Sequence, residues 1–205
     1  MNGGLGAEML RAAVIAGIFL AIFAVAEGWR HFGDPKPEWT RKLVHFGGGL
    51  VSLALPWLVR SHWTVLALGA LLGALLLVTR RLGLLPSVHG VSRHSEGAVY
   101  FPAAVYLVFL LAADRPILYL ISVLTLVVSD ALAALVGTTY GKITYRVERD
   151  RRSIEGSTVF FLATFLAVHL PLLLLTEVDR VVSVLVAVQI ALLVTILEAI
   201  SLDGA

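Results

Sequence analysis

The sequence predicts an all-α integral membrane protein, a polytopic bundle of about seven transmembrane helices. Of its 205 residues, 59% are hydrophobic and only 15% are charged, whereas a soluble domain carries about 25% charged residues. The apolar residues also gather into seven segments, most of which approach the roughly 20 residues that a helix needs to cross a bilayer. Because internal repeats and low-complexity linkers are absent, we expect a single domain over residues 1–205.

The seven segments are Leu10–Trp29, Trp39–Val59, Trp63–Thr79, Val99–Ala113, Ile117–Val136, Val159–Leu175 and Val181–Ile200. The first could instead be the core of a signal peptide. The cations that follow it at once resist translocation, which favours a retained helix. The fourth is short and contains Pro102, so we expect it to be tilted or to start deeper in the protein.

The Lys and Arg residues are distributed unevenly over the connections. If seven helices alternate in direction, the first, third and fifth connections lie on one side and contain twelve of the 16 Lys and Arg residues: Arg30, Lys36, Arg41, Lys42, Arg80, Arg81, Arg93, Lys142, Arg146, Arg149, Arg151 and Arg152. This bias predicts that these connections are cytoplasmic and that the N-terminus is outside.

The first basic connection leads into a helix with a candidate functional stripe. Arg41, His45, Gly48 and Ser52 share one face, because they are separated by offsets of four, seven and eleven residues. Glycine would allow this stripe to pack closely on the Asp130 stripe described below. For Arg41 and Lys42 alone, a membrane anchor is the stronger interpretation. His45 lies just inside the apolar segment, which favours a functional role.

The second basic connection, Ser92–Pro102, is polar and rich in small residues. Its candidates are Arg93, Glu96 and Gly97, which could fold over a headgroup or a nucleotide. A plain loop is the stronger interpretation of this segment.

The third basic connection follows an acidic residue inside an apolar segment. Asp130, Ala133, Gly137 and Gly141 recur at helical spacing and predict one narrow stripe. A carboxylate there costs a few kcal/mol unless it is paired or bound to a metal. Either a metal ligand or a structural partner of an arginine fits, and the glycines and cations that follow favour a site for a nucleoside triphosphate with Mg²⁺.

The element Ser153-Ile154-Glu155-Gly156-Ser157 opens the sixth segment. Free backbone N–H groups and the helix dipole favour an anion at such a position. A plain N-cap is the commoner role of a serine like Ser157.

Together these motifs resemble the polyprenol kinase family, which includes dolichol kinase, phytol kinase and the CTP-dependent diacylglycerol kinase and is related to the CDP-diacylglycerol synthases. The resemblance rests on Arg41-Lys42-x-x-His45, Gly97-x-x-Tyr100-Phe101-Pro102, the Asp130 stripe and Ser153-x-Glu155-Gly156-Ser157, and spans roughly residues 38–200. It implies phosphoryl transfer from CTP to the hydroxyl of a membrane lipid: a polyprenol or dolichol, phytol or diacylglycerol.

The resemblance also suggests roles for individual residues. Asp130 would hold Mg²⁺, and a triphosphate would lie against Gly137 and Gly141. His45, Glu155 or Glu96 could position the attacking hydroxyl, and the sequence does not choose among them. The remaining candidates would bind the phosphates: Arg41, Lys42, Lys142, Arg152, Ser153, Gly156 and Ser157.

Two departures from the family pattern affect this interpretation. Arg152 stands where the family commonly has Lys, which preserves the charge but not the shape. Family members continue past the last segment into an Asp-Asn pair, whereas this sequence stops shortly after Glu198, so either the chain is truncated or this member lacks the pair.

Two functions are alternatives to a lipid kinase. One is a cytidylyltransferase that forms a CDP-lipid, and the other, from another class, is a small transporter or structural membrane subunit. We expect no nucleic-acid partner, and the sequence leaves the oligomeric state open.

Overall fold

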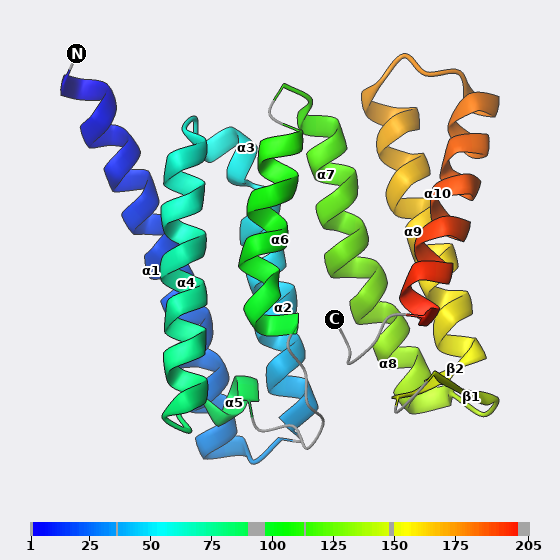
Figure 1. Ribbon diagram of the computed structural model, residues 1–205, viewed down its shortest axis with the longest axis horizontal. Helices are drawn as coiled ribbons and strands as arrows, with labels where there is room; N and C mark the ends of the chain where they lie inside the picture. Colours follow the sequence, from blue (N-terminus) through cyan, green and yellow to red (C-terminus); the bar gives the residue numbers. More distant parts are fainter. Residues whose placement is uncertain (1, 36, 90–96, 113, 148–149, 201–205) are drawn as a thin grey trace. The chain divides into compact units, whose positions relative to one another are not determined.

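The computed structural model describes residues 2–35, 37–89, 97–112, 114–147 and 150–200 as helices, short connections and one two-stranded sheet (Figure 1). The chain divides into two compact units, Met1–Asp114 and Arg115–Ala205. The single domain expected from the sequence stays a prediction.

In the described residues of the first unit, four helices have 15 or more residues and two have four residues. Its elements are α1 (Asn2–Gly33), α2 (Pro37–Leu53), α3 (Leu55–Leu58), α4 (His62–Arg81), α5 (Pro86–His89) and α6 (Gly97–Leu111). Proline opens α2 and α5, where its fixed φ suits a first helical turn and its missing N–H costs nothing. Just after the end of α4, Gly83 has a φ of 66°. Glycine suits this position because it adopts the left-handed conformation without a steric penalty.

Hydrogen bonds between elements hold both ends of the first unit. At one end, the backbone N–H of Ser87 donates to Glu27 Oε2 (3.2 Å) and Thr40 Oγ1 donates to the Ser87 carbonyl (2.9 Å). At the other end, Glu8 accepts hydrogen bonds from the N–H groups of Arg60 and Ser61, both at 3.1 Å. These bonds fix α1 against α2, α5 and the α3–α4 connection.

The second unit consists of three long helical segments and a β-hairpin. Its elements are α7 (Pro116–Leu124), the π-helical turn η1 (Thr125–Ser129), α8 (Asp130–Tyr140), β1 (Thr144–Val147), β2 (Asp150–Ser153), α9 (Ile154–Leu175) and α10 (Arg180–Ile200). Buried Ile121, Val168 and Ala187 form a core among α7, α9 and α10. His169 Nδ1 and Ser183 Oγ, 2.9 Å apart, add a polar contact between α9 and α10.

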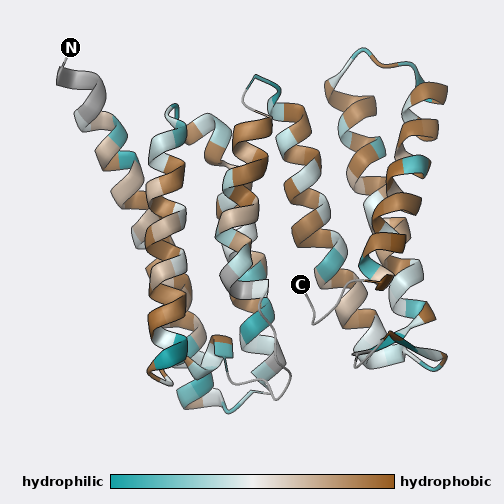
Figure 2. Ribbon diagram, in the orientation of Figure 1, coloured by the Kyte–Doolittle hydropathy of each residue, from teal (hydrophilic) through white to brown (hydrophobic). Residues whose placement is uncertain are grey.

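The structure confirms an all-α membrane bundle. Five of the seven predicted segments lie within single helical stretches, whereas Trp39–Val59 is divided between α2 and α3, and Val99–Ala113 is helical only as far as Leu111. Five helical stretches of the described chain are long and apolar enough to cross a membrane: Gly6–Gly33, His62–Arg81, Pro116–Tyr140, Ile154–Leu175 and Arg180–Ile200. Figure 2 shows apolar residues along these helices and hydrophilic residues gathered near connections. The helix α2 does not meet that criterion and α6 is short, so the count of seven crossings and their orientation stay predictions.

One element differs from expectation. The residues after Lys142 were expected to form a basic loop, but Thr144–Val147 and Asp150–Ser153 pair as antiparallel strands. Thr, Tyr and Val favour strands, and polar and apolar side chains alternate in Thr144-Tyr145-Arg146-Val147. This alternation covers only four residues, which is too few for a clear strand prediction among so many charged side chains.

Candidate functional site

Asp130 occupies a distinctive backbone position in the second unit. It is the first residue of α8 and directly follows the π-helical turn η1. Such turns inside α-helices occur frequently at functional sites. The Asp130 side chain is exposed, whereas the preceding Ser129 is fully buried. The backbone at this point therefore presents the carboxylate at the surface of the unit.

The stripe that begins at Asp130 faces the start of α9. A Cβ on Gly156 would lie 3.1 Å from the Ala133 carbonyl oxygen and 3.2 Å from Gly137 Cα. Ala133 and Gly137 follow Asp130 at offsets of three and seven, which share a helix face. The stripe is shorter than predicted, because α8 ends at Tyr140 and Gly141 has extended backbone (φ −64°, ψ 106°).

The glycines of this stripe serve helix packing. A Cβ on Gly141 would lie 2.3 Å from the Gly137 carbonyl oxygen and 2.7 Å from Ser153 Cβ, and a Cβ on Gly137 would lie 3.0 Å from Ser153 Oγ. Neither residue could carry a side chain without displacing Ser153. The clearance predicted for a triphosphate is thus filled by the start of α9, and contact of a nucleotide with these glycines stays a prediction.

The N-terminus of α9 is closed by its own hydrogen bonds. Ser153 is the N-cap, and its Oγ accepts the Gly156 N–H at 3.0 Å. The Ile154 N–H donates to the Ile143 carbonyl at 2.9 Å. Two N–H groups of the first turn are therefore already bonded, and the binding of a nucleotide by Ser153 and Gly156 stays a prediction.

Glu155 and Ser157 attach the hairpin to α9. The Glu155 Oε1 atom accepts the backbone N–H groups of Lys142 (2.9 Å) and Ile143 (3.2 Å). The hydroxyls of Ser157 and Tyr145 lie 2.7 Å apart. Ser157 is thus not the N-cap, and Glu155 holds the backbone of Lys142 while the Lys142 side chain is exposed.

The hairpin gathers cations. Arg146 lies directly opposite Arg151, and Tyr145 lies opposite Arg152. Arg146 and Arg151 are both exposed, and like charges directly opposite on a sheet are destabilising. An anion bound beside the two guanidinium groups would reduce their mutual repulsion.

Arg152 has an acidic partner within the second unit. It forms an ion pair with Glu198, near the end of α10, and the two side chains are only 15% and 23% exposed. The sequence does not predict this pair, because the two residues are far apart along the chain.

The first unit contains a separate group of candidates on α2. Arg41, Lys42 and His45 are partly buried. The His45 ring lies edge-on to Phe101 of α6, with centroids 5.6 Å apart. A Cβ on Gly48 would lie 3.1 Å from Phe19 of α1, so the clearance at Gly48 serves the packing of α1 on α2.

The remaining predicted residues fall in or beside the second connection. Arg93 and Glu96 lie outside the described residues, and Gly97 is the first residue of α6. Within the described chain no group of three or more His, Cys, Asp or Glu residues could hold a metal ion. The predicted packing of the Arg41 stripe on the Asp130 stripe stays a prediction.

The chain is similar in sequence to a phytol kinase. A phytol kinase from Synechocystis sp. is 32% identical over 168 residues, which cover 80% of this chain and 72% of the relative. No family model matches the chain, and no solved structure matches it. Identity at this level over most of both sequences confirms the resemblance that the motifs indicated. The chain belongs to the polyprenol kinase family.

Proposed function

We propose that this protein is a CTP-dependent lipid-alcohol kinase. The hydroxyl oxygen of a membrane lipid would attack the γ-phosphorus of CTP, the bond from that phosphorus to the β–γ bridging oxygen would break, and the hydroxyl proton would be released. The observation that carries the proposal is the similarity to phytol kinase over 80% of the chain. CTP as the donor rests on the family resemblance.

The second unit offers side chains suited to a triphosphate. The exposed side chains of Lys142, Arg146 and Arg151 and the partly buried Arg152 would neutralise the charge that builds up on the transferring phosphoryl group. Glu155 would act as a positioning residue, since its carboxylate fixes the backbone of Lys142.

The donor set at Asp130 fits Mg²⁺. This ion usually keeps several water ligands and is bound through one or two carboxylates together with substrate phosphates. One exposed carboxylate therefore suffices, and a larger acidic cluster is not required. Asp130 would hold the ion, which when bound would neutralise negative charge on the phosphates.

His45 and Glu96 remain candidates for positioning the acceptor hydroxyl, because Glu155 already accepts two backbone N–H groups. Glu96 lies outside the described residues. An imidazole can accept a hydroxyl proton near neutral pH.

The test supplies purified protein with Mg²⁺, CTP labelled on its γ-phosphate, and a panel of lipid alcohols. A kinase places the label in the lipid. With a phosphatidic acid added in a parallel reaction, a cytidylyltransferase would release labelled pyrophosphate instead, and a transporter or structural subunit would give neither product. ATP, GTP and UTP at equal concentration test the choice of nucleotide.

Substitution of Asp130 tests its role. We expect Asp130→Asn to lower turnover about a thousandfold while the helical circular dichroism signal is unchanged. Glu177→Gln removes a carboxylate from the exposed α9–α10 connection and should leave turnover unchanged. Full activity of Asp130→Asn would remove Asp130 from the mechanism.

A further inference from the structure

The β-hairpin of the second unit has two faces of different chemistry (Figure 1). Tyr145 and Arg152, which lie opposite each other, are turned toward the helices. The Tyr145 hydroxyl bonds to α9, and Arg152 pairs with Glu198 of α10. Because successive side chains of a strand point to opposite faces, Arg146 and Arg151 lie on the other face, where both are exposed.

The exposed face holds two like charges at close range. Arg146 lies directly opposite Arg151, and the Cβ atoms of such a pair are about 4.5–5.5 Å apart. Arg151 also donates a hydrogen bond to the Thr144 hydroxyl at 3.1 Å, but this neutral group does not offset its charge. A phosphate between two guanidinium groups would offset both charges and accept bidentate hydrogen bonds. The face therefore suits an anion that carries a phosphate.

The hairpin joins the ends of two candidate membrane-spanning stretches, Pro116–Tyr140 and Ile154–Leu175. Three large side chains at its base are exposed: Tyr140 by 67%, Ile143 by 61% and Ile154 by 48%. Tyrosine is enriched at the boundary between membrane and water, and exposed apolar groups beside it favour contact with lipid. The base of the hairpin is thus expected at the boundary of the hydrocarbon layer.

The arginine pair then lies at the depth of the lipid headgroups. It is two residues beyond the first pair of the ladder, Thr144 and Ser153, which is at most about 7 Å along a strand. The polar layer of each leaflet is about 5–8 Å thick. A lipid phosphate is therefore within reach of both guanidinium groups, while its acyl chains can contact Ile143.

We propose that Arg146 and Arg151 bind the phosphate of an anionic phospholipid from the surrounding leaflet, and that this lipid and CTP compete for the pair. The proposal rests on the function proposed above, which assigns the same side chains to the triphosphate, and adds a regulation of that site. A zwitterionic phospholipid binds less well, because its ammonium group returns a positive charge to the pair.

Lipid retention tests the site without an assay of activity. Protein in a neutral detergent is mixed with phosphatidylglycerol or phosphatidylcholine, and the bound lipids are counted by native mass spectrometry. We expect half-maximal retention of phosphatidylglycerol at a concentration lower by about tenfold. Equal retention of the two lipids would overturn the proposal.

Removal of the pair locates the retained lipid. Arg146→Gln combined with Arg151→Gln should weaken retention of phosphatidylglycerol about tenfold or more. The matched control combines Arg115→Gln with Arg180→Gln, which are exposed residues of the same unit at the opposite ends of its helices. The control should retain the lipid as wild type does. Equal loss in the two double variants, or no loss in the first, would contradict the proposed site.

Competition shows whether lipid and nucleotide share the pair. CTP with Mg²⁺ should displace phosphatidylglycerol from the wild-type protein, whereas inorganic phosphate at the same concentration should not, because it has one phosphate in place of three. Displacement by both would indicate a site for any soluble anion, and displacement by neither would separate the lipid from the nucleotide. Either result would overturn the proposal.

Kinetics in nanodiscs complete the test. Replacing part of the phosphatidylcholine with phosphatidylglycerol should raise the KM for CTP of the wild-type protein and leave kcat unchanged. A negative surface repels CTP from every variant, so the increase must be at least about threefold larger for wild type than for the Arg146 and Arg151 double variant. Equal increases would overturn the competition. A wild-type protein that phosphorylates no alcohol would instead remove the proposed function, and lipid retention would still decide whether the pair binds phospholipid.

Discussion

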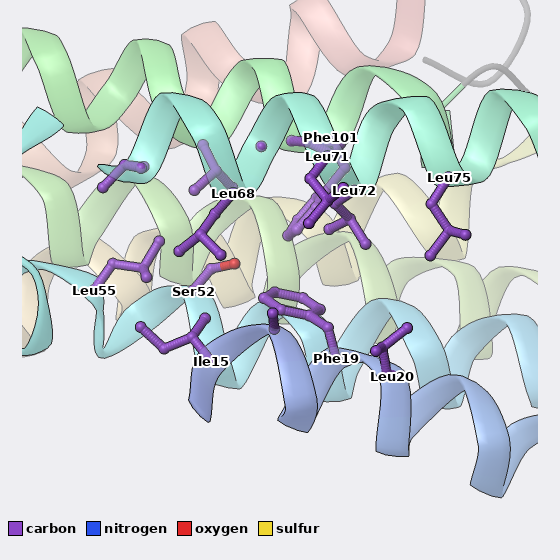
Figure 3. A pocket seen from close by; sticks show the side chains of 15 residues that line it. Ile15, Phe19, Leu20, Ser52, Leu55, Leu68, Leu71, Leu72, Leu75 and Phe101 are labelled. Carbon is purple, nitrogen blue, oxygen red and sulfur yellow. The ribbon is translucent and has the colours of Figure 1, made fainter. Parts of the chain in front are cut away.

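The two units differ in how many of their glycines are close-packed. In the first, an added Cβ on Gly48 would lie 3.1 Å from Phe19, but Gly17 and Gly73 have no atom within 4 Å of an added Cβ, and the helices surround an apolar cavity (Figure 3). In the second, an added Cβ on any of the described glycines, Gly137, Gly141 and Gly156, would lie 3.0 Å or less from a neighbouring atom. Close packing of glycine is thus general among the described residues that follow Asp130 and only partial in the first unit.

The largest difference between the units is expected when one methyl group is added to a glycine of each. We expect Gly141→Ala to lower stability by about 3 kcal/mol, because its Cβ would clash with the Gly137 carbonyl oxygen. Gly73→Ala, in an uncrowded helix interior, should raise stability by up to about 1 kcal/mol. Thermal unfolding in detergent, followed by circular dichroism, measures both.

The location of the tryptophans sharpens that experiment. Trp29, Trp39, Trp57 and Trp63 all lie in the first unit, so tryptophan fluorescence reports on that unit while circular dichroism reports on both. Equal midpoints for Gly141→Ala and Gly73→Ala would contradict the contrast between the units.

Ion pairs offer the next largest effect. Arg152 pairs with Glu198 while both are largely buried, whereas Arg30 pairs with Glu27 at 3.4 Å with the side chains 40% and 35% exposed. Removing one partner of a buried pair leaves an uncompensated charge. We therefore expect Arg152→Gln to cost about 2 kcal/mol, and Arg30→Gln about 0.5 kcal/mol.

Urea or thermal unfolding of the two arginine variants checks this ranking. A larger loss for Arg30→Gln than for Arg152→Gln would show that burial does not decide the strength of these pairs.

Helix caps give a smaller contrast. Ser153 accepts a hydrogen bond from the third residue of α9, whereas Ser61, the N-cap of α4, makes no side-chain cap bond. We expect Ser153→Ala to cost about 1 kcal/mol and Ser61→Ala to stay within about 0.5 kcal/mol of wild type. Similar midpoint shifts for the two variants would mean that the cap bond of α9 contributes little.

The smallest effect concerns pH and the first unit. Burial lowers the pKa of His89 below its ordinary value of about 6.5, and the positive charge of Arg80 lowers it further. The unfolded chain therefore binds a proton at a higher pH than the folded chain does. Stability should be full above pH of about 6.5 and should fall as the pH drops from there toward the lower pKa of the folded protein.

The free energy of unfolding, measured by tryptophan fluorescence at intervals of about half a pH unit between about pH 5 and 8, would show this loss of stability. His89→Gln should flatten the profile. A wild-type profile that is unchanged by His89→Gln would assign the pH dependence to other groups.

Hydropathy was sufficient to predict where the helices lie, because burial in a bilayer requires long apolar segments. It did not reveal the hairpin, since four-residue strands between Lys142 and Ser153 are too short for a strong periodic signal. The sequence also identified the acidic and cationic residues of the candidate site, but it did not identify their partners. Glu155 accepts hydrogen bonds from backbone N–H groups 12 and 13 residues away, and Glu198 forms an ion pair with Arg152.

The glycines show a limit of pattern reading. Gly137 and Gly141 predict a surface without side chains, but a sequence does not state whether a ligand or another helix fills it. Here the cap of α9 does. What fills the space beside these glycines depends on residues that are distant along the chain, and their positions are known only from the three-dimensional structure.

The π-helical turn before Asp130 determines the rotational phase of everything that follows on α8. An α-helix advances about 100° per residue, and a π-helical turn takes in about one residue more than an α-helical turn does. In an uninterrupted α-helix of the same sequence, α8 would therefore be rotated relative to α7, and Gly137 would no longer face Gly156. The wider turn thus lets one continuous apolar helix keep its α7 face in the core of the unit and still bring Ala133 and Gly137 against the first turn of α9.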